Sequence, residues 1–363
     1  MTDVLMVLKT QNLKNDQRVL KEIRSLTQHG AKVEIFVTKN CEMTQEQLGH
    51  PIYDIKISGG AAPTNLILQF LGIFQFYIKF ILFVINKKYK KFWVCDPIMF
   101  GLVLLIRSIK PTSKIIWDHH ELPPSWFLNN KILMFFFKKA YSKADVNIHA
   151  NEPRKNYLEG LLGIKSKVGY IISNYPESIN IGKEALDEKG EDWLSKNKKF
   201  IYLQNCLQEN RYGQQTIKAA ISAGYKVFHA GKIESDYIEK YNLSDDEVFF
   251  AGYLSAEQIN YVLEKCTFTI ILYKQNSLNQ TFCDANRLYQ AMSLGVPIIS
   301  GNNPTLVDAT KDYKNCVILK DDGRDVESIR LAILELLSDI SCREPKLFDW
   351  SFYDYVFAEV VAR

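Results

Sequence analysis

The chain has 363 residues, of which 47% are apolar and 24% charged, and its formal net charge is +4. This composition excludes disordered, collagen-like and coiled-coil proteins, and the length favours two globular domains over one. The seven cysteines occur singly, without a CxxC pair. We therefore expect neither a disulfide scaffold nor a zinc ribbon, and we expect a reducing compartment.

The charge is unevenly distributed along the chain. Residues 1–190 carry 26 Lys and Arg against 17 Asp and Glu, whereas residues 191–363 carry 19 against 24. The first half should therefore be attracted to anionic surfaces. The opening residues MTDVLMVLKT lack the basic region and cleavage site of a secretory signal, so the expected location is the cytoplasm.

Short apolar runs alternate with amphipathic stretches along almost the whole chain, which is typical of α/β proteins with parallel sheets. A helix is predicted over 16–29, because Asn15 or Asp16 can cap it and Gly30 stands where it should end. The predicted strands of the first half are 4–8, 32–37, 52–57, 92–95, 114–117, 146–149 and 168–172.

The segment 66–86 is long and apolar enough to resemble a membrane span. A strongly basic run follows at 87–91, so an interfacial or core-packed helix is favoured over a span. Two interpretations stay open: a sheet-covering helix with a solvated basic end, and peripheral binding to anionic lipid, which LMFFFKK at 133–139 favours slightly. The polar or small residues of the segment share one helical face of about 120°; they are Gln69, Gly72, Gln75, Lys79 and Asn86.

The second half repeats the alternation. Its predicted strands are 200–204, 226–229, 248–250, 268–272 and 296–300, and its helices include 212–223 and 286–294. The polar stretch 176–199 is the predicted linker between a domain at 1–175 and a domain at 200–345. A last aromatic-rich helix within 346–363 should dock outside the second sheet.

Two α/β domains of this kind are typical of nucleotide-binding proteins, since strand ends and helix N-termini supply backbone amides that can bind phosphate. The chain has no GxGxxG after a strand, no GxxxxGK[ST] and no GxSxG. NAD-dependent, P-loop and α/β-hydrolase chemistry are therefore disfavoured.

The most informative stretch is DANRLYQAMSLGVPIISGNNP at 284–304, which predicts a helix, a tight turn and a buried strand. It resembles the donor-facing helix of GT-B glycosyltransferases, particularly family-4-like enzymes, which reads roughly P-N-K-L-x-E-x-M-x-x-G-V-P-V-I. The alternative is a merely structural helix-turn-strand. The matching positions are Asn286, Arg287, Leu288, Ala291, Met292, Gly295, Val296, Pro297 and Ile298.

Three further stretches extend the resemblance over most of the chain: NDQRVLKEIRSLTQHGAKVEIF at 15–36, IWDHHEL at 116–122 and FFAGY at 249–253. The resemblance implies two Rossmann-like domains that face each other across a cleft. It places the acceptor on residues 1–175 and a nucleotide-sugar donor on residues 200–340. It also implies a C-terminal helix that crosses back to the first domain.

The donor site departs from the family pattern. Many members carry E-x7-E, and the corresponding positions here are Phe282 and Gln290. Gln290 can still bond a hydroxyl group, whereas sugar recognition at the first position would fall to neighbours such as Cys283 and Asp284. Arg211 can bind a diphosphate, although an exposed arginine at a helix start is the alternative. The predicted donor-binding residues are Arg211, Lys232, Tyr253, Asp284, Asn286, Arg287 and Gln290.

His120 is predicted to lie beside the reacting sugar, oriented by Asp118 or Glu121, with a structural histidine as the alternative. We take His120 and Asp118 as the catalytic candidates. Asp16 and Arg18 are predicted to bind the acceptor, with helix capping and a solvated helix face as equal alternatives. Arginine, lysine and helix dipoles can stabilise a leaving diphosphate, so neither a metal nor another cofactor is predicted.

The predicted function is transfer of a sugar from a nucleotide diphosphate sugar to a saccharide or lipid-linked acceptor. The resemblance implies retention of configuration, and the basic first half suggests surface polysaccharide synthesis at an anionic membrane, with no nucleic-acid partner. Two alternatives stay open. One is a nucleotide-sugar epimerase of the same fold, and the other is an inactive binding subunit, suggested by Phe282 and Gln290 in place of both glutamates.

Overall fold

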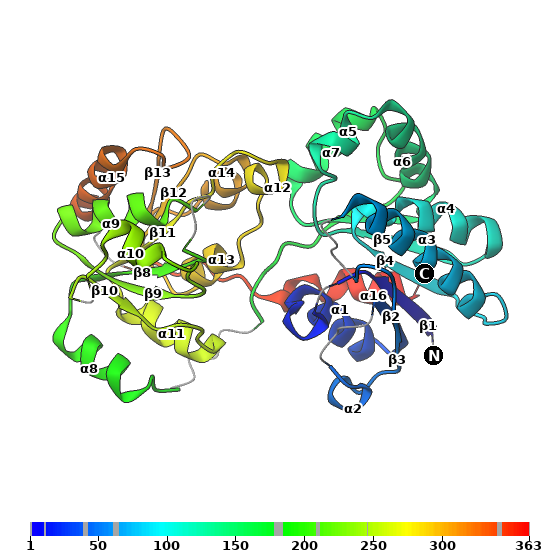
Figure 1. Ribbon diagram of the computed structural model, residues 1–363, viewed down its shortest axis with the longest axis horizontal. Helices are drawn as coiled ribbons and strands as arrows, with labels where there is room; N and C mark the ends of the chain where they lie inside the picture. The colour runs from blue at the N-terminus through cyan, green and yellow to red at the C-terminus, as the bar shows by residue number, and fades with distance from the viewer. Residues whose placement is uncertain are drawn as a thin grey trace. The chain divides into compact units, whose positions relative to one another are not determined.

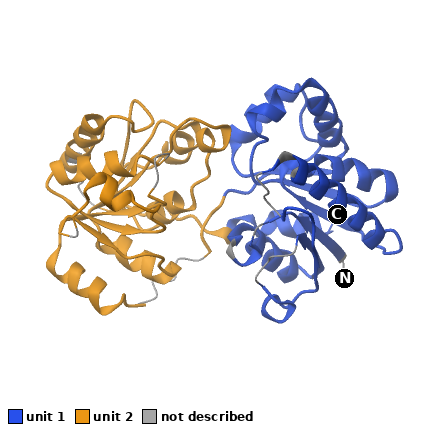
Figure 2. Cartoon of the chain, viewed as in Figure 1, with its two compact units in different colours: residues 1–173, 352–363 blue, residues 174–351 orange. Residues whose placement is uncertain are grey.

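The computed structural model describes residues 2–10, 12–38, 43–60, 65–177, 184–207, 211–244, 246–339 and 343–362. The chain forms two compact units, shown in Figure 2: unit 1 holds residues 1–173 and 352–363, and unit 2 holds residues 174–351. Each unit contains one parallel sheet covered by helices (Figure 1). The predicted α/β architecture with two Rossmann-like domains is therefore confirmed.

The sheet of unit 1 has seven strands in the order β3-β2-β1-β4-β5-β6-β7, and all neighbours are parallel. The strands are β1 (Thr2–Leu8), β2 (Ala31–Thr38), β3 (Ile52–Ile55), β4 (Lys91–Cys95), β5 (Lys114–His119), β6 (Val146–His149) and β7 (Gly169–Ile171). The helices are η1 (Leu13–Asn15), α1 (Gln17–Gln28), α2 (Gln45–Leu48), α3 (Leu66–Val84), η2 (Pro97–Met99), α4 (Phe100–Ile109), α5 (Ser125–Leu128), α6 (Lys131–Lys143), α7 (Glu152–Leu162) and α16 (Asp354–Ala362).

Successive residues of the unit 1 strands pack on opposite faces of the sheet. In β4, Phe92 meets Phe80 of α3 with ring centroids 6.1 Å apart, whereas Trp93 stacks on Phe357 of α16 at 6.0 Å. In Figure 1, α16 lies beside α1, and the two helices are in contact. Because helices cover both faces, the strands read as continuous apolar runs, and this is why the sequence predicts them well.

The last helix is fixed to unit 1 by a buried lysine. Lys91 donates from Nζ to the carbonyl oxygens of Val360 and Val361, each at 2.5 Å. These carbonyl groups belong to the last turn of α16, where the helix itself supplies no donors. The chain thus returns to unit 1 after residue 351, as the family resemblance implies.

The sheet of unit 2 has six strands in the order β10-β9-β8-β11-β12-β13, again all parallel. The strands are β8 (Phe200–Gln204), β9 (Lys226–Ala230), β10 (Val248–Phe250), β11 (Phe268–Ile271), β12 (Ile298–Ser300) and β13 (Cys316–Ile318). The helices are α8 (Glu188–Lys196), α9 (Gly213–Ser222), α10 (Tyr237–Tyr241), α11 (Ala256–Lys265), α12 (Leu278–Thr281), α13 (Asn286–Ser293), α14 (Pro304–Thr310) and α15 (Val326–Asp339). The short helix η4 (Trp350–Tyr353) spans the boundary between the units.

The two faces of this sheet belong to two hydrophobic clusters. Ile201 and Leu203 of β8 pack with residues of α9 and α15. Phe200 and Tyr202 pack with residues of α8, α11 and α13. The period-two alternation along β8 therefore places α13 on one face and leaves its N-terminus near the carboxyl ends of the strands.

The division between the units falls between residues 173 and 174, close to the end of the domain predicted for 1–175. The stretch 176–199, predicted as a linker, contains α8, whose Leu194 is buried in the core of unit 2. Strand β13 has no counterpart among the predicted strands. Within the part of the chain that the structure describes, none of the helices combines the length and apolar character that a membrane crossing needs.

Candidate functional site

Unit 1 gathers charged side chains at the carboxyl ends of β4 and β5. Asp118 lies in β5, His120 directly follows the end of that strand, and Cys95 is the last residue of β4. Helix α1 contributes Arg18 and Glu22 to the same group of side chains. All of these residues except His120 are at least nine-tenths buried, and His120 keeps 13% of its side chain exposed.

The imidazole of His120 is held between two carboxylates. Its Nε2 lies 2.8 Å from Oδ2 of Asp118, and its Nδ1 lies 3.8 Å from Oδ1 of Asp96. Although burial opposes charge, Asp118 raises the pKa of His120 well above its usual value. His120 is therefore an imidazolium at neutral pH and acts as a donor of hydrogen bonds. Of its two predicted partners, Asp118 makes the contact, whereas Glu121 is exposed.

Arg18 binds the carboxylate of Asp118, the partner of His120. Its Nη2 donates to Oδ1 of Asp118 at 2.9 Å, its Nε to Oδ2 at 3.2 Å, and its Nη1 to the carbonyl of Ile172 at 2.6 Å. These contacts hold the Asp118 carboxylate in place for His120. Asp16 caps α1 by accepting from Val19 N. The contact of Asp16 and Arg18 with an acceptor stays a prediction; the bonds seen are capping and positioning bonds.

Glu22 and Asp118 share this buried site with opposite protonation. Burial, reinforced by the nearby Asp118 carboxylate, raises the pKa of Glu22 to about 8. Burial also disfavours ionised Asp118, but Arg18 and His120 outweigh it and hold the pKa of Asp118 well below its usual value. At neutral pH the site thus holds a neutral Glu22 beside an ionised Asp118.

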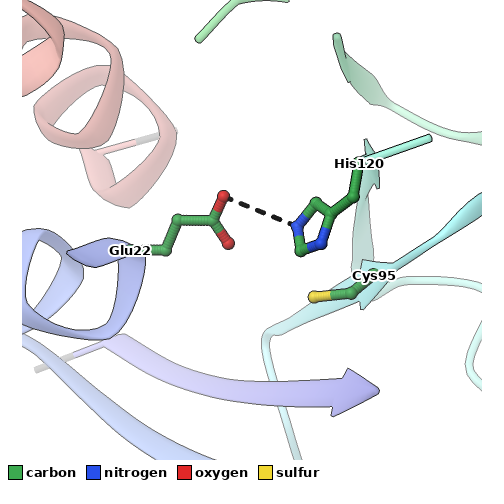
Figure 3. A group of neighbouring side chains, drawn as sticks. All are labelled: Glu22, Cys95 and His120. Atoms are coloured by element: carbon green, nitrogen blue, oxygen red, sulfur yellow. Dashed lines mark ion pairs between the residues drawn. The ribbon is translucent and has the colours of Figure 1, made fainter. Parts of the chain in front are cut away.

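Figure 3 shows Glu22, Cys95 and His120, whose potential ligand atoms all lie within 4.8 Å of one another. Their surroundings fit a metal ion poorly. The guanidinium of Arg18 lies 3.1 Å from Oε1 of Glu22 and would repel a cation there. The His120 nitrogen that faces Glu22 is already bonded to Asp118, and burial raises the pKa of the Cys95 thiol. We assign no metal to this cluster.

Asp96 is a strained residue beside His120. Its backbone has φ 72° and ψ 141°, a conformation that residues with a side chain rarely adopt. Two bonds maintain it: Asp96 N donates to Asp118 O at 2.9 Å, and the Trp117 indole donates to Asp96 O at 3.0 Å. Burial raises the pKa of Asp96 to about 6, and its side chain is 30% exposed. Backbone strain at the carboxyl end of a strand, next to a charged histidine, is typical of a functional position.

The protonation of Glu22 gives unit 1 a pH-dependent stability. The pKa of Glu22 rises from about 4.5 to about 8 on folding, so ionisation of Glu22 opposes folding. The free energy of unfolding therefore decreases as the pH rises from about 4.5 to about 8. Glu22→Gln keeps the neutral shape and should raise the unfolding temperature of unit 1 by about 5–10 °C at pH 8.5, with little change at pH 5. Calorimetric unfolding at both pH values measures the difference. An equal effect of the substitution at both would contradict the protonated state.

Unit 2 presents a pair of arginines at the carboxyl edge of its sheet. Arg211 lies two residues before α9, and Arg287 lies in the first turn of α13. Their guanidinium carbons lie 4.2 Å and 4.9 Å from the ring centroid of Tyr273, which follows β11. Burial, with the nearby Arg287, lowers the pKa of Arg211. Among the described residues neither arginine pairs with a carboxylate.

Several buried polar atoms around this pair lack a hydrogen-bond partner in the described part of the chain. Arg287 donates from Nη1 to the carbonyl of Gln204, but its Nε and Nη2 have no acceptor, and neither has Nε of Arg211. Oδ1 of Asn286 and of Asn205 are unpaired too. Unpaired buried donors cost free energy, and an oxyanion ligand would satisfy them.

The other predicted donor residues have different settings. Gln290 is buried, and its amide donates to Oδ1 of Asn260 at 2.5 Å. Asp284 accepts from the Asn174 amide and from the Tyr289 hydroxyl. Lys232, after β9, and Tyr253, after β10, are exposed. The structure therefore brings Arg211 and Arg287 together at Tyr273, and Asn286 directly precedes Arg287 in α13. The donor-binding roles of all seven residues stay predictions.

Sequence reasoning missed several members of these sites, namely Glu22, Cys95, Asp96, Gln204, Asn205 and Tyr273. A usable signal existed for Asp96, Asn205 and Tyr273, because each closely follows a predicted strand. Glu22 lies one turn after Arg18 on α1, and nothing in the sequence pairs it with β5.

Residues 195–346 match the family model described as glycosyl transferases group 1. The resemblance to GT-B glycosyltransferases is confirmed. The match covers most of unit 2 and less than half of the whole chain. None of the curated proteins matches the chain.

Solved GT-B structures share the fold at low sequence identity. The Anabaena protein HepE in complex with UDP has a TM-score of 0.71 and 14% identity, with both chains fully covered. A sucrose-phosphate synthase from Thermosynechococcus elongatus has a TM-score of 0.69 and 14% identity, over 100% of this chain and 98% of that chain. A Listeria monocytogenes protein titled as a UDP-N-acetylglucosamine 2-epimerase has a TM-score of 0.66 and 12% identity, over 99% and 95%. At these identities the likeness shows the fold alone.

Proposed function

We propose that the chain is a glycosyltransferase that moves a sugar from a nucleotide diphosphate sugar to a saccharide or lipid-linked acceptor. The observation that carries the proposal is the arginine pair of unit 2. Two guanidinium groups flank Tyr273 at the start of two helices, with buried N–H groups that lack acceptors among the described residues. A diphosphate supplies the charge and the oxygen atoms that this arrangement needs.

The pair also supplies what the chemistry demands. In the transfer, the bond between the sugar carbon and the diphosphate oxygen breaks and the diphosphate leaves with the electron pair. The acceptor oxygen forms the new bond to that carbon, and its proton passes to the leaving diphosphate. Arg211, Arg287 and the N-terminus of α13 would stabilise the leaving diphosphate electrostatically. We propose metal-independent transfer on this ground, and retention of configuration on the family match of residues 195–346.

Unit 1 would bind the acceptor and contact the sugar. The charged imidazole of His120 can donate a hydrogen bond to a sugar hydroxyl, and the partly exposed carboxyl group of Asp96 can accept one. Arg18 and Asp118 act through His120 and are positioning residues. An acceptor of surface polysaccharide synthesis fits the basic character of this half of the chain.

A screen of thermal unfolding with UDP, GDP, dTDP and their sugars tests the donor assignment. One nucleotide diphosphate and its sugar should raise the unfolding temperature by several degrees at saturating concentration. No shift with any of them would refute the proposal.

The alternative function is that of a nucleotide-sugar epimerase, which the likeness to the Listeria protein supports. Incubation with the same donor distinguishes an epimerase from a transferase. A transferase hydrolyses the donor only slowly when no acceptor is present, whereas an epimerase converts it to a second nucleotide sugar. The group 1 family match favours transfer. Nuclear magnetic resonance of the donor after incubation with the protein alone reports which reaction occurs.

A further inference from the structure

Helix α3 exposes an apolar face to the outside of unit 1. Ile67, Phe70, Phe74 and Leu82 expose between 63% and 73% of their side chains. At 100° per residue they fall within about 120° of the helix circumference, together with Leu71, Ile78 and Ile85, which are also exposed. Soluble monomers rarely expose a continuous apolar stripe of this length.

The other faces of α3 already satisfy the packing of unit 1. Phe76, Phe80 and Val84 are buried, and the two phenylalanines contact Phe36 of β2. The polar face lies against residues 56–58: Gln75 bonds Ser58, and Lys79 donates to the Lys56 carbonyl at 2.6 Å. The sequence left open whether this helix merely covers the sheet. The structure shows that it covers the sheet and still has an apolar face left over.

Helices α5 and α6 carry further exposed apolar residues, and α6 is linked to α3 through α4. Tyr77 of α3 reaches within 2.8 Å of a Cβ position on Gly101 of α4, and α4 packs on α6 through Phe100 and Phe137. The exposed apolar residues of this part are Trp126, Ile132, Phe135 and Phe136. We call the exposed apolar residues of α3, α5 and α6 the outer face.

The charge around the outer face is mainly positive. Residues 54–145 contain thirteen Lys and Arg against five acidic residues; Asp96, Asp118 and Glu121 lie at the carboxyl ends of β4 and β5, and Asp145 pairs with Arg107. Lys88 and Lys90 follow α3 and are exposed. Lys131, Lys138 and Lys139 are exposed on α6. A second copy of the chain would bring like charges together, which disfavours self-association through this face.

We infer that the outer face docks unit 1 on a membrane surface that contains anionic lipids. The apolar side chains of α3 and α6 would enter the boundary between head groups and acyl chains, and the flanking lysines would contact lipid phosphates. The helices would lie in the interface and not cross it. This inference does not depend on the proposed activity, because its test contains no sugar donor.

Flotation of the full-length protein with vesicles tests the inference. Vesicles of phosphatidylcholine with one third phosphatidylglycerol should bind the protein, and vesicles of phosphatidylcholine alone should bind it far more weakly. The triple variant Phe70→Ser, Phe74→Ser, Leu82→Ser should lose binding by at least about 100-fold. Lys88→Glu with Lys90→Glu should lose at least about 20-fold at low salt.

A matched control lies in unit 2, where Leu331 and Leu334 of α15 are also exposed. The variant Leu331→Ser, Leu334→Ser should bind vesicles within twofold of the unmodified protein. Thermal unfolding shows whether the triple variant is folded. If the triple variant is unfolded, vesicle binding by the lysine variant tests the inference instead. Equal binding of the triple or lysine variant and the unmodified protein, or no binding to any vesicle, would overturn the inference. A dimer without lipid that the triple variant loses would overturn it in favour of self-association.

Discussion

Arg287→Ala is expected to weaken binding of the nucleotide diphosphate by at least about 100-fold, since charged hydrogen bonds contribute about 1.5–3 kcal/mol each and two donors are lost. The two donors are Nε and Nη2, which are buried and have no partner among the described residues. Arg211→Ala should have an effect of similar size, because its guanidinium lies against the same Tyr273 ring. Titration calorimetry with the nucleotide that gives the largest thermal shift measures both.

Two controls separate charge from geometry and from folding. Arg287→Lys keeps the charge but loses the planar fork, so it should recover only part of the lost affinity. Arg330→Ala, in α15, removes an arginine that pairs with Glu327 and should leave nucleotide affinity unchanged. If both Arg211→Ala and Arg287→Ala stay folded and bind the nucleotide normally, the donor site lies elsewhere.

The sheets could be predicted from the sequence because their strands are buried on both faces. Strands β6, β8 and β10 have the predicted limits. Strand β8 shows why, since an almost continuous apolar run bounded by polar residues marks it. Helix α13 and the turn at Gly295 follow from the motif at 284–304, and Gly295 has the positive φ that the turn needs.

The candidate sites were predictable only where their members are neighbours in sequence or follow strands. His120 and Asp118 are two residues apart, so their pairing was visible. Arg18 is 100 residues from Asp118, and only the fold shows that the two residues meet. The sequence does not tell whether a charged helix residue faces solvent or a buried carboxylate, and the acceptor contact of Arg18 stays a prediction.

The structure also changes how the missing glutamates of the donor motif are understood. Gln290 is buried against Asn260 of α11. One of the two N–H groups of its amide is used there, so the other N–H group and the carbonyl oxygen of Gln290 can still bond a ligand hydroxyl. We therefore expect charge recognition in unit 2 to depend mainly on Arg211 and Arg287. This is why the inactive-subunit alternative predicts the same nucleotide binding and has to be tested by activity.

His120→Ala is expected to lower the rate of sugar transfer by about 10²–10³-fold, which is the usual cost of removing one electrostatic donor at a reacting centre. Nucleotide affinity should stay within twofold, because the arginine pair lies in unit 2. Asp118→Asn should lower the rate as well, since Asp118 holds the imidazolium in place. Product formation with the selected donor and a saccharide acceptor measures the rate, and calorimetry measures the affinity.

The matched control for His120 is its neighbour. His119 points to the opposite face of β5, where it bonds Asn147 at 3.1 Å and stacks on His149. Burial lowers its pKa to about 4, so it is neutral in the folded protein. His119→Gln should therefore lower stability but leave the transfer rate per folded molecule nearly unchanged. A folded His120→Ala variant with full transfer activity would show that the charged cluster of unit 1 is structural, because the imidazolium is the one group of that cluster placed to donate to a sugar.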